Sequence, residues 1–124
     1  MFVYFILCFC FLIFLQCHFS FVFYSIDVNL TCEAPNNNNI IIVEWSRTDL
    51  GEEYVLFYRD GHFLPDDQHP SFKNRVDLQD RQMKDGDVSL ILKDVTINDT
   101  GTYECRICLS ESATESQQFL LNSA

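Results

Sequence analysis

The chain has 124 residues, enough for one domain with a substantial buried core. Its formal net charge at pH 7 is -10, and every charged residue lies at Asp27 or later, so this charge belongs to the part expected to fold. Nucleic-acid binding depends on a basic surface that displaces counterions. The composition therefore argues against a nucleic-acid partner, and against adhesion to anionic lipid.

The N-terminal segment is uncharged and strongly apolar, with an unbroken apolar run from Phe2 to Leu15. Such a run is typical of a secretory signal peptide, although no basic residue precedes it and no Ala-x-Ala site follows. An uncleaved membrane anchor and a misassigned start codon are the alternatives. We expect residues 1–25 to be a signal peptide or membrane anchor. If they are not removed, Phe19 to Tyr24 could form a first strand.

From Ile26 onward, short runs of alternating apolar and polar residues are separated by turn clusters, which predicts an all-β sandwich. Val43 and Trp45 should face inward, as should alternate residues of the later strands. The expected strands are Ile26 to Cys32, Ile40 to Arg47, Tyr54 to Tyr58, His62 to Leu64, Arg75 to Leu78, one carrying Val88, Leu90 and Leu92, one carrying Tyr103, Cys105 and Ile107, and Ser116 to Leu121.

Two turn signals divide these strands. Pro35 and the four asparagines that follow it cannot continue a strand and predict a loop. Asp60-Gly61 is a strong hairpin signal between Tyr54 to Tyr58 and His62 to Leu64. This hairpin adds two strands to the middle of the chain.

The cysteine, tryptophan and tyrosine positions carry a family resemblance. Cys32 precedes Trp45, and Tyr103 stands two places before Cys105, a pattern that resembles an immunoglobulin sandwich. The resemblance implies that Cys32 and Cys105 form a disulfide between two sheets, with Trp45 packed on it. It also implies that the Tyr103 hydroxyl holds a strand corner to upstream backbone.

The added hairpin makes the match more specific. Asp27 to Leu121 resembles an immunoglobulin V-set domain of the butyrophilin and myelin-oligodendrocyte-glycoprotein branch of the B7 family. The implied fold class is an all-β, immunoglobulin-like V-set β-sandwich of two antiparallel sheets with a C′–C″ hairpin, over residues 26–122. The motifs that carry this resemblance are Val43-Glu44-Trp45, Tyr58-Arg59-Asp60-Gly61, Asn74-Arg75-Val76, Val88 to Leu92, and Asp94-Val95 through Cys105.

The resemblance also assigns roles to surface residues. Arg75 and Asp99 match the two positions that form an ion pair at the base of a V-set domain; the alternative is two independent surface charges. Asn29-Leu30-Thr31 and Asn98-Asp99-Thr100 are glycosylation sequons, which places candidate glycans on Asn29 and Asn98. Strand alternation turns Asn29 outward, because Leu30 and Cys32 face in.

The sheet formed by strands G, F, C and C′ is the candidate binding face. Alternation places outward-facing charged residues on two of its strands, and the family phase adds aromatic and aliphatic residues from the C′ strand; aromatic and arginine anchors mark protein interfaces. Cys108 points to the same face, as an unpaired thiol, an intermolecular disulfide or a partner of Cys17. The predicted face consists of Glu44, Tyr54, Leu56, Tyr58, Glu104 and Arg106.

No catalytic arrangement is present in this sequence, since no nucleophile is matched with a base and no recognised metal-ligand spacing occurs. We therefore expect no enzyme, no cofactor and no small-molecule substrate. The expected function is an extracellular module, secreted or on the external side of the plasma membrane, that binds another cell-surface protein and modulates lymphocyte activation. The alternative is a homophilic or heterophilic cell-adhesion V-set domain, whose self-association would use the GFCC′ face.

Overall fold

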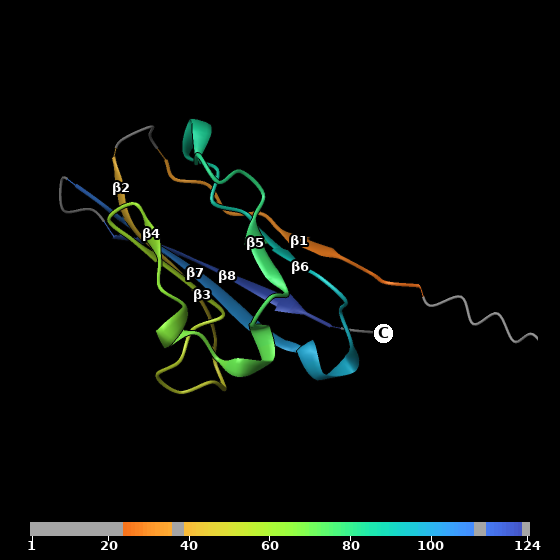
Figure 1. The fold of residues 1–124 in the computed structure, drawn as a ribbon. Coiled ribbons are helices and arrows are strands. Elements are labelled where there is room, and N and C mark those ends of the chain that lie inside the picture. The colour runs from red at the N-terminus through yellow and green to blue at the C-terminus, as the bar shows by residue number, and fades with distance from the viewer. Residues whose placement is uncertain (1–23, 36–38, 111–113, 123–124) are drawn as a thin grey trace, which may run out of the picture.

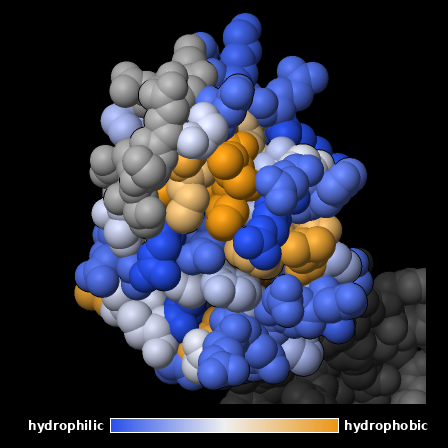
Figure 2. All heavy atoms as spheres, turned by 90° about the vertical axis from the view of Figure 1, so that its left-hand side faces the viewer, coloured by the Kyte–Doolittle hydropathy of each residue, from blue (hydrophilic) through white to orange (hydrophobic). Residues whose placement is uncertain are grey.

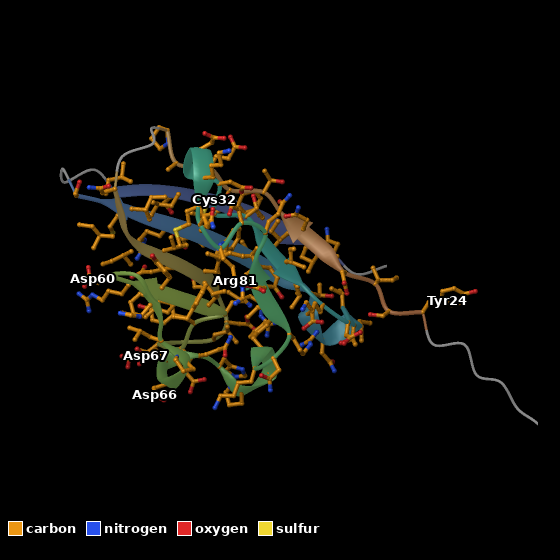
Figure 3. All side chains as sticks on the ribbon, turned by 45° about the horizontal axis from the view of Figure 1, so that its top comes forward. Tyr24, Cys32, Asp60, Asp66, Asp67 and Arg81 are labelled. Carbon is orange, nitrogen blue, oxygen red and sulfur yellow. A yellow bond between two sulfur atoms is a disulfide. The ribbon has the colours of Figure 1, made fainter. Side chains whose placement is uncertain are left out.

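The computed structural model describes residues 24–35, 39–110 and 114–122. The interpretation of residues 1–25 as a leader or anchor, and of Phe19 to Tyr24 as a strand, therefore falls almost entirely outside the described residues. Tyr24 itself extends away from the body of the domain (Figure 3) and is 87% exposed. Within the described ranges, no helix combines the length and hydrophobicity needed to cross a bilayer.

The described residues form two antiparallel sheets that pack against each other (Figure 1). This is the all-β two-sheet architecture that the sequence predicted. The three-stranded sheet has the order β1 (Val28–Leu30), β6 (Leu90–Leu92), β5 (Val76–Leu78), and the five-stranded sheet has the order β4 (His62–Phe63), β3 (Leu56–Arg59), β2 (Ile40–Arg47), β7 (Gly101–Leu109), β8 (Thr114–Leu121). Short 3₁₀ turns connect them at η1 (Pro65–Asp67), η2 (Pro70–Phe72), η3 (Lys84–Gly86) and η4 (Ile97–Asp99).

The strand boundaries follow the sequence pattern closely for β2, which spans the predicted Ile40–Arg47. β3 begins at Leu56 instead of Tyr54, because Tyr54 pairs its backbone with Asp67 and His69 instead of β2. The hairpin between β3 and β4 turns at Asp60 and Gly61, whose φ angles of 48° and 89° are both positive. That combination is what a two-residue hairpin turn of the right twist requires.

The core lies between the sheets and is built from the alternate residues that the sequence pattern turned inward. Val43 and Trp45 of β2 are fully buried, and the Trp45 Nε1–H donates to the Val88 carbonyl oxygen at 2.9 Å. The same inward phase holds on the later strands. Relative exposure is 0–1% for Val88, Leu90, Leu92, Tyr103, Cys105 and Ile107.

Cys32 and Cys105 form a disulfide within this core. Cys32 follows β1 in the three-stranded sheet, and Cys105 lies in the middle of β7 in the five-stranded sheet, so the bond joins the two sheets. Cys105 is also the register partner of Trp45 on the neighbouring strand. The indole and the disulfide therefore share one layer of the core.

The base of the sandwich is closed by Arg75 and Asp99, which form a two-pronged ion pair. The Arg75 guanidinium donates to the Asp99 carboxylate at 2.6 Å and 3.1 Å, and Asp99 is only 2% exposed. Arg75 also donates to the carbonyl oxygens of Ser71, Lys93 and Asp94. A planar guanidinium suits this role, since several of its donors are fixed in one plane.

Asp99 is held from the other side by its own turn. The Thr96 N–H donates to the Asp99 carboxylate at 2.8 Å, and the Tyr103 hydroxyl donates to the Asp99 carbonyl oxygen at 2.6 Å. Burial by itself would raise the pKa of Asp99, but the hydrogen bonds from Arg75 and from the Thr96 N–H hold that pKa below its ordinary value. The carboxylate is therefore ionised in the folded protein at neutral pH.

Arg47, at the end of β2, is a second structural arginine that the sequence pattern did not single out. Its guanidinium carbon lies 5.4 Å from the centre of the Phe72 ring and 6.0 Å from that of Tyr103, which is cation–π distance. A Cβ atom at Gly101 would lie 2.7 Å from the Arg47 side chain. Glycine at this position leaves the room that the Arg47 side chain occupies.

The disulfide should contribute a large share of the stability. Replacing Cys32 and Cys105 together by serine is expected to lower the free energy of unfolding by about 4 kcal/mol, because the bond closes a long loop in the unfolded chain. Non-reducing peptide mapping should recover the two cysteines in one linked peptide pair. Cys108→Ser, which leaves this bond in place, is the matched control. Labelling of Cys32 and Cys105 by a thiol reagent in the native protein would contradict the assignment.

Removing the Asp99 carboxylate should be costly, because Arg75 would remain largely buried without its counter-charge. Asp99→Ala is expected to lower the free energy of unfolding by about 3–5 kcal/mol in a denaturant titration. The variant keeps the backbone carbonyl of residue 99, which accepts the hydrogen bond from the Tyr103 hydroxyl. Arg81→Ala breaks an ion pair whose arginine is 71% exposed and should leave stability nearly unchanged. If Asp99→Ala and Arg81→Ala lowered the free energy of unfolding equally, the Arg75–Asp99 ion pair would not be a major source of stability.

The Asp99 ion pair also predicts a pH dependence. Because the folded-state pKa of Asp99 lies below its value in the unfolded chain, the pair stabilises the fold fully above the ordinary aspartate pKa of about 3.9. This stabilisation is lost as the pH falls through the lowered folded-state pKa. Thermal melting from neutral pH to about pH 2 should show a smaller acid-dependent loss in Asp99→Asn than in the parent chain. If the melting temperatures of Asp99→Asn and the parent chain fell by the same amount as the pH was lowered, the prediction would be contradicted.

Candidate functional site

The outward surface of the five-stranded sheet brings together side chains from four strands and from the segment before β3. On β2 and β7, Glu44 stands opposite Arg106 and Ser46 opposite Glu104, which places four polar side chains side by side. β8 extends this row, because Ser116 is the register partner of Arg106. We call this surface the outer face and define it as Ile42, Glu44, Ser46, Tyr54, Phe57, Glu104, Arg106 and Ser116.

Arg106 is the centre of the polar network on the outer face. Its guanidinium lies 3.4 Å from the Glu44 carboxylate and 3.3 Å from that of Glu104, and Ser116 donates to Glu104 at 2.7 Å. The Arg106 side chain remains 49% exposed, whereas Glu44 and Glu104 are 17% and 21% exposed. Ion pairs this exposed are worth little, so an incoming partner can rearrange them at small cost.

An aromatic pair lies beside the charged network. The rings of Tyr54 and Phe57 stack with centroids 4.7 Å apart and planes 12° from parallel. Both side chains are half-buried. Burial, followed by the charge of Glu44, raises the pKa of Tyr54 above its ordinary value, so its hydroxyl stays protonated and can donate a hydrogen bond. The pair therefore offers flat apolar area with one polar tip.

A hollow of about 360 Å³ lies where Tyr54 meets the charged residues of β2 and β7. Its walls include Glu44, Glu53, Tyr54, Glu104 and Arg106. Small-molecule pockets are mainly apolar with a few polar groups, whereas this hollow is mainly polar. Elsewhere, Figure 2 shows hydrophobic side chains as small patches in a mostly hydrophilic surface on the side that faces left in Figure 1.

The structure corrects two members of the predicted binding face. Leu56 is only 4% exposed and belongs to the core, and Tyr58 packs against the same core with its ring edge-on to Phe63. The register explains both positions, since Leu56 pairs with the inward Trp45 and Tyr58 with the inward Val43. Neither residue is on the outer face.

The physical cause is a break in alternation at the start of β3. Val55 and Leu56 are consecutive and both are buried, which breaks the alternation expected of a strand with one buried face. Their burial shifts the phase of β3, so that Phe57 stands opposite the outward Glu44. Phe57 is therefore the outer-face aromatic residue that the sequence reading missed. No local sequence signal marks this shift, because the pairing of Leu56 with Trp45 is set by segments that are distant in the chain.

The remaining candidate residues lie apart from the outer face. Asn29 is exposed on β1 of the three-stranded sheet, and Asn98 is exposed in η4 at the base. The acidic residues Asp66 and Asp67, which could suggest a metal site, belong to η1, at the lower left of Figure 3. Across the part of the chain that the structure describes, no group of three or more His, Cys, Asp or Glu is arranged to hold a metal ion.

Comparison with solved structures supports the fold. The chain aligns with the human B7-H4 IgV-like domain at a TM-score of 0.68 and 24% identity, covering 76% of this chain and 82% of that one. At this identity, the likeness establishes a shared architecture. That architecture is the two-sheet sandwich with the β3–β4 hairpin described above.

Comparison with curated sequences adds two mouse relatives. Butyrophilin subfamily 1 member A1 is 32% identical over 81 residues, and "Selection and upkeep of intraepithelial T-cells protein 7" is 30% identical over 81 residues. Each match covers 64% of this chain, but only 15% and 20% of the respective relative. The chain thus spans about a fifth or less of those proteins.

A family model matches most of the chain. The immunoglobulin V-set domain model covers residues 24–122, which include every described strand and the Cys32–Cys105 disulfide. The same segment carries Trp45, the Arg75–Asp99 ion pair and the Tyr103 hydroxyl contact. Taken together with the shared architecture, this match establishes that the chain belongs to the immunoglobulin V-set domain family.

Proposed function

We infer that this chain is the extracellular recognition module of a B7- or butyrophilin-like protein, and that it modulates lymphocyte activation by binding another cell-surface protein. The relatives support the immune context, since one is a butyrophilin and another is named for the selection and upkeep of intraepithelial T cells. The disulfide supports an extracellular placement, because such bonds persist in oxidising compartments. The activity is recognition and involves no catalysis.

The outer face carries this proposal. Arg106 lies between two carboxylates and beside the Tyr54–Phe57 stack, so an arginine and two aromatic rings occupy one continuous surface. Arginine and aromatic residues are enriched among the residues that dominate binding energy at protein interfaces. The exposed ion pairs around Arg106 would give way to partner groups with little loss. We place the partner contact on this face.

Charge on the outer face also indicates the character of the partner surface. Glu44, Glu52, Glu53 and Glu104 line the hollow together with Arg47 and Arg106, so carboxylates outnumber guanidinium groups there. A partner with a matching basic rim would gain in association rate and specificity. This interpretation extends the recognition proposal and depends on it.

Truncation of outer-face residues tests the proposal. In a soluble, tagged form of the domain, Arg106→Ala and Tyr54→Ala are each expected to weaken binding to lymphocytes or epithelial cells by roughly 2 kcal/mol if they are interface hot spots. The measurement is a cell-binding titration by flow cytometry. Arg81→Ala, which removes an exposed arginine paired with a carboxylate on the other sheet, is the matched control.

Two results would count against this function. Loss of cell binding in Arg81→Ala but not in the outer-face variants would move the contact to the three-stranded sheet. Sedimentation velocity at several concentrations separates recognition from adhesion. Self-association that rises with concentration and is abolished by Arg106→Ala would instead favour the adhesion function through the same face.

A further inference from the structure

Asn29 occupies the middle of the outward surface of the three-stranded sheet. It pairs in register with Ile91 of β6, which in turn pairs with Asp77 of β5, so these three residues form one row across the sheet. Asn29 is exposed while the next residue, Leu30, is buried. The third residue of the sequon, Thr31, is exposed as well. All the groups that define a glycan acceptor are thus outside the core.

The Asn29 side chain has a defined direction. Its Nδ2 atom donates to Gln79 Oε1 at 2.7 Å, although Gln79 follows β5 on the far side of β6. The amide therefore points across the sheet and not away from the domain. Gln79 engages one of the two Nδ2 hydrogens, so a sugar would take the place of the other and start over the three-stranded sheet, beside Gln79 and the turn that contains Arg81.

β1 is also an edge strand in the described part of the chain, with β6 as its neighbour there. Its ladder to the β6 side is longer than the strand itself, because backbone hydrogen bonds continue from Ile26 to Ala34. Long edges can pair with other chains, and proteins commonly block them. A bulky, hydrated group at the middle of this edge would do so.

We propose that Asn29 carries an N-linked glycan that lies over the outward surface of the three-stranded sheet and its β1 edge. The outer face of the five-stranded sheet is then the broad surface that remains open to a protein partner. This inference rests on the proposed function only in requiring passage through the secretory pathway, where such glycans are added.

Two substitutions at one position separate the sequon from the asparagine. Thr31→Ala removes the sequon and Thr31→Ser keeps it, and both leave Asn29 and its contact with Gln79 unchanged. The full chain and both variants are expressed in mammalian cells and collected from the medium. Enzymatic release of N-glycans converts the modified asparagine to aspartate. We expect mass spectrometry to find this conversion at residue 29 in the parent and in Thr31→Ser, but not in Thr31→Ala.

Limited trypsin digestion of the native proteins then tests where the glycan lies. Cleavage after Arg81 should be several-fold slower in Thr31→Ser than in Thr31→Ala, because the glycan lies over that turn. Cleavage after Arg59 should proceed equally in both, since Asp60 and the β3–β4 hairpin lie well apart from Arg81 (Figure 3). Asn98→Gln removes the sequon at the base of the sandwich and should leave the Arg81 rate unchanged.

The outcomes distinguish this inference from the proposed function. An unmodified residue 29 in secreted protein, or equal cleavage after Arg81 in the two Thr31 variants, would overturn it. Enzymatic deglycosylation of the parent chain provides a second comparison that needs no substitution, and it should raise the Arg81 cleavage rate to that of Thr31→Ala. A secreted chain that is glycosylated and protected in this way, but binds no cells, would overturn the proposed function alone.

Discussion

The bond between Cys32 and Cys105 fixes the two sheets at the centre of the core, and the rest of the domain is arranged around it. Trp45 stands beside Cys105 in register and donates its indole N–H to Val88, on the chain segment leading into β6. One covalent link and one buried hydrogen bond therefore connect the sheets in the same layer. Strand alternation then turns the remaining apolar side chains into this layer, where their burial supplies the main favourable free energy.

The base of the sandwich depends on a second, polar constraint. Asp99 receives hydrogen bonds from Arg75 and from the Thr96 N–H, and its carbonyl oxygen receives one from Tyr103. Above this network, Arg47 covers the rings of Phe72 and Tyr103. Among the described residues, no buried side-chain nitrogen or oxygen lacks a hydrogen-bond partner. The cost of burying these charges is therefore offset by complete satisfaction of their hydrogen bonds.

The two sheets present surfaces of different character. The five-stranded sheet offers an arginine with exposed, rearrangeable ion pairs beside a stacked aromatic pair. The three-stranded sheet offers a narrower row centred on Ile91, with Asn29 directed across it. Rigid attachment of both sheets to one core means that neither surface needs to order itself on binding. Preorganisation of this kind lowers the entropic cost of association.

The sequence by itself determined the strands, the turn at Asp60-Gly61, and the inward residues on β2, β6 and β7, because alternation with a period of two is a local property of each strand. The Cys, Trp and Tyr pattern was equally sufficient for the disulfide and the fold class. Only the tertiary structure decided which residues of β3 face outward. Val55 and Leu56 are both drawn into the core, and Tyr54 pairs with the loop at Asp67, so the phase depends on contacts distant in sequence. Leu56 and Tyr58 were therefore misplaced, and Phe57 was missed. The direction of the Asn29 side chain and the contacts of Arg47 could not be predicted from the sequence for the same reason, since their partners lie in other strands and turns.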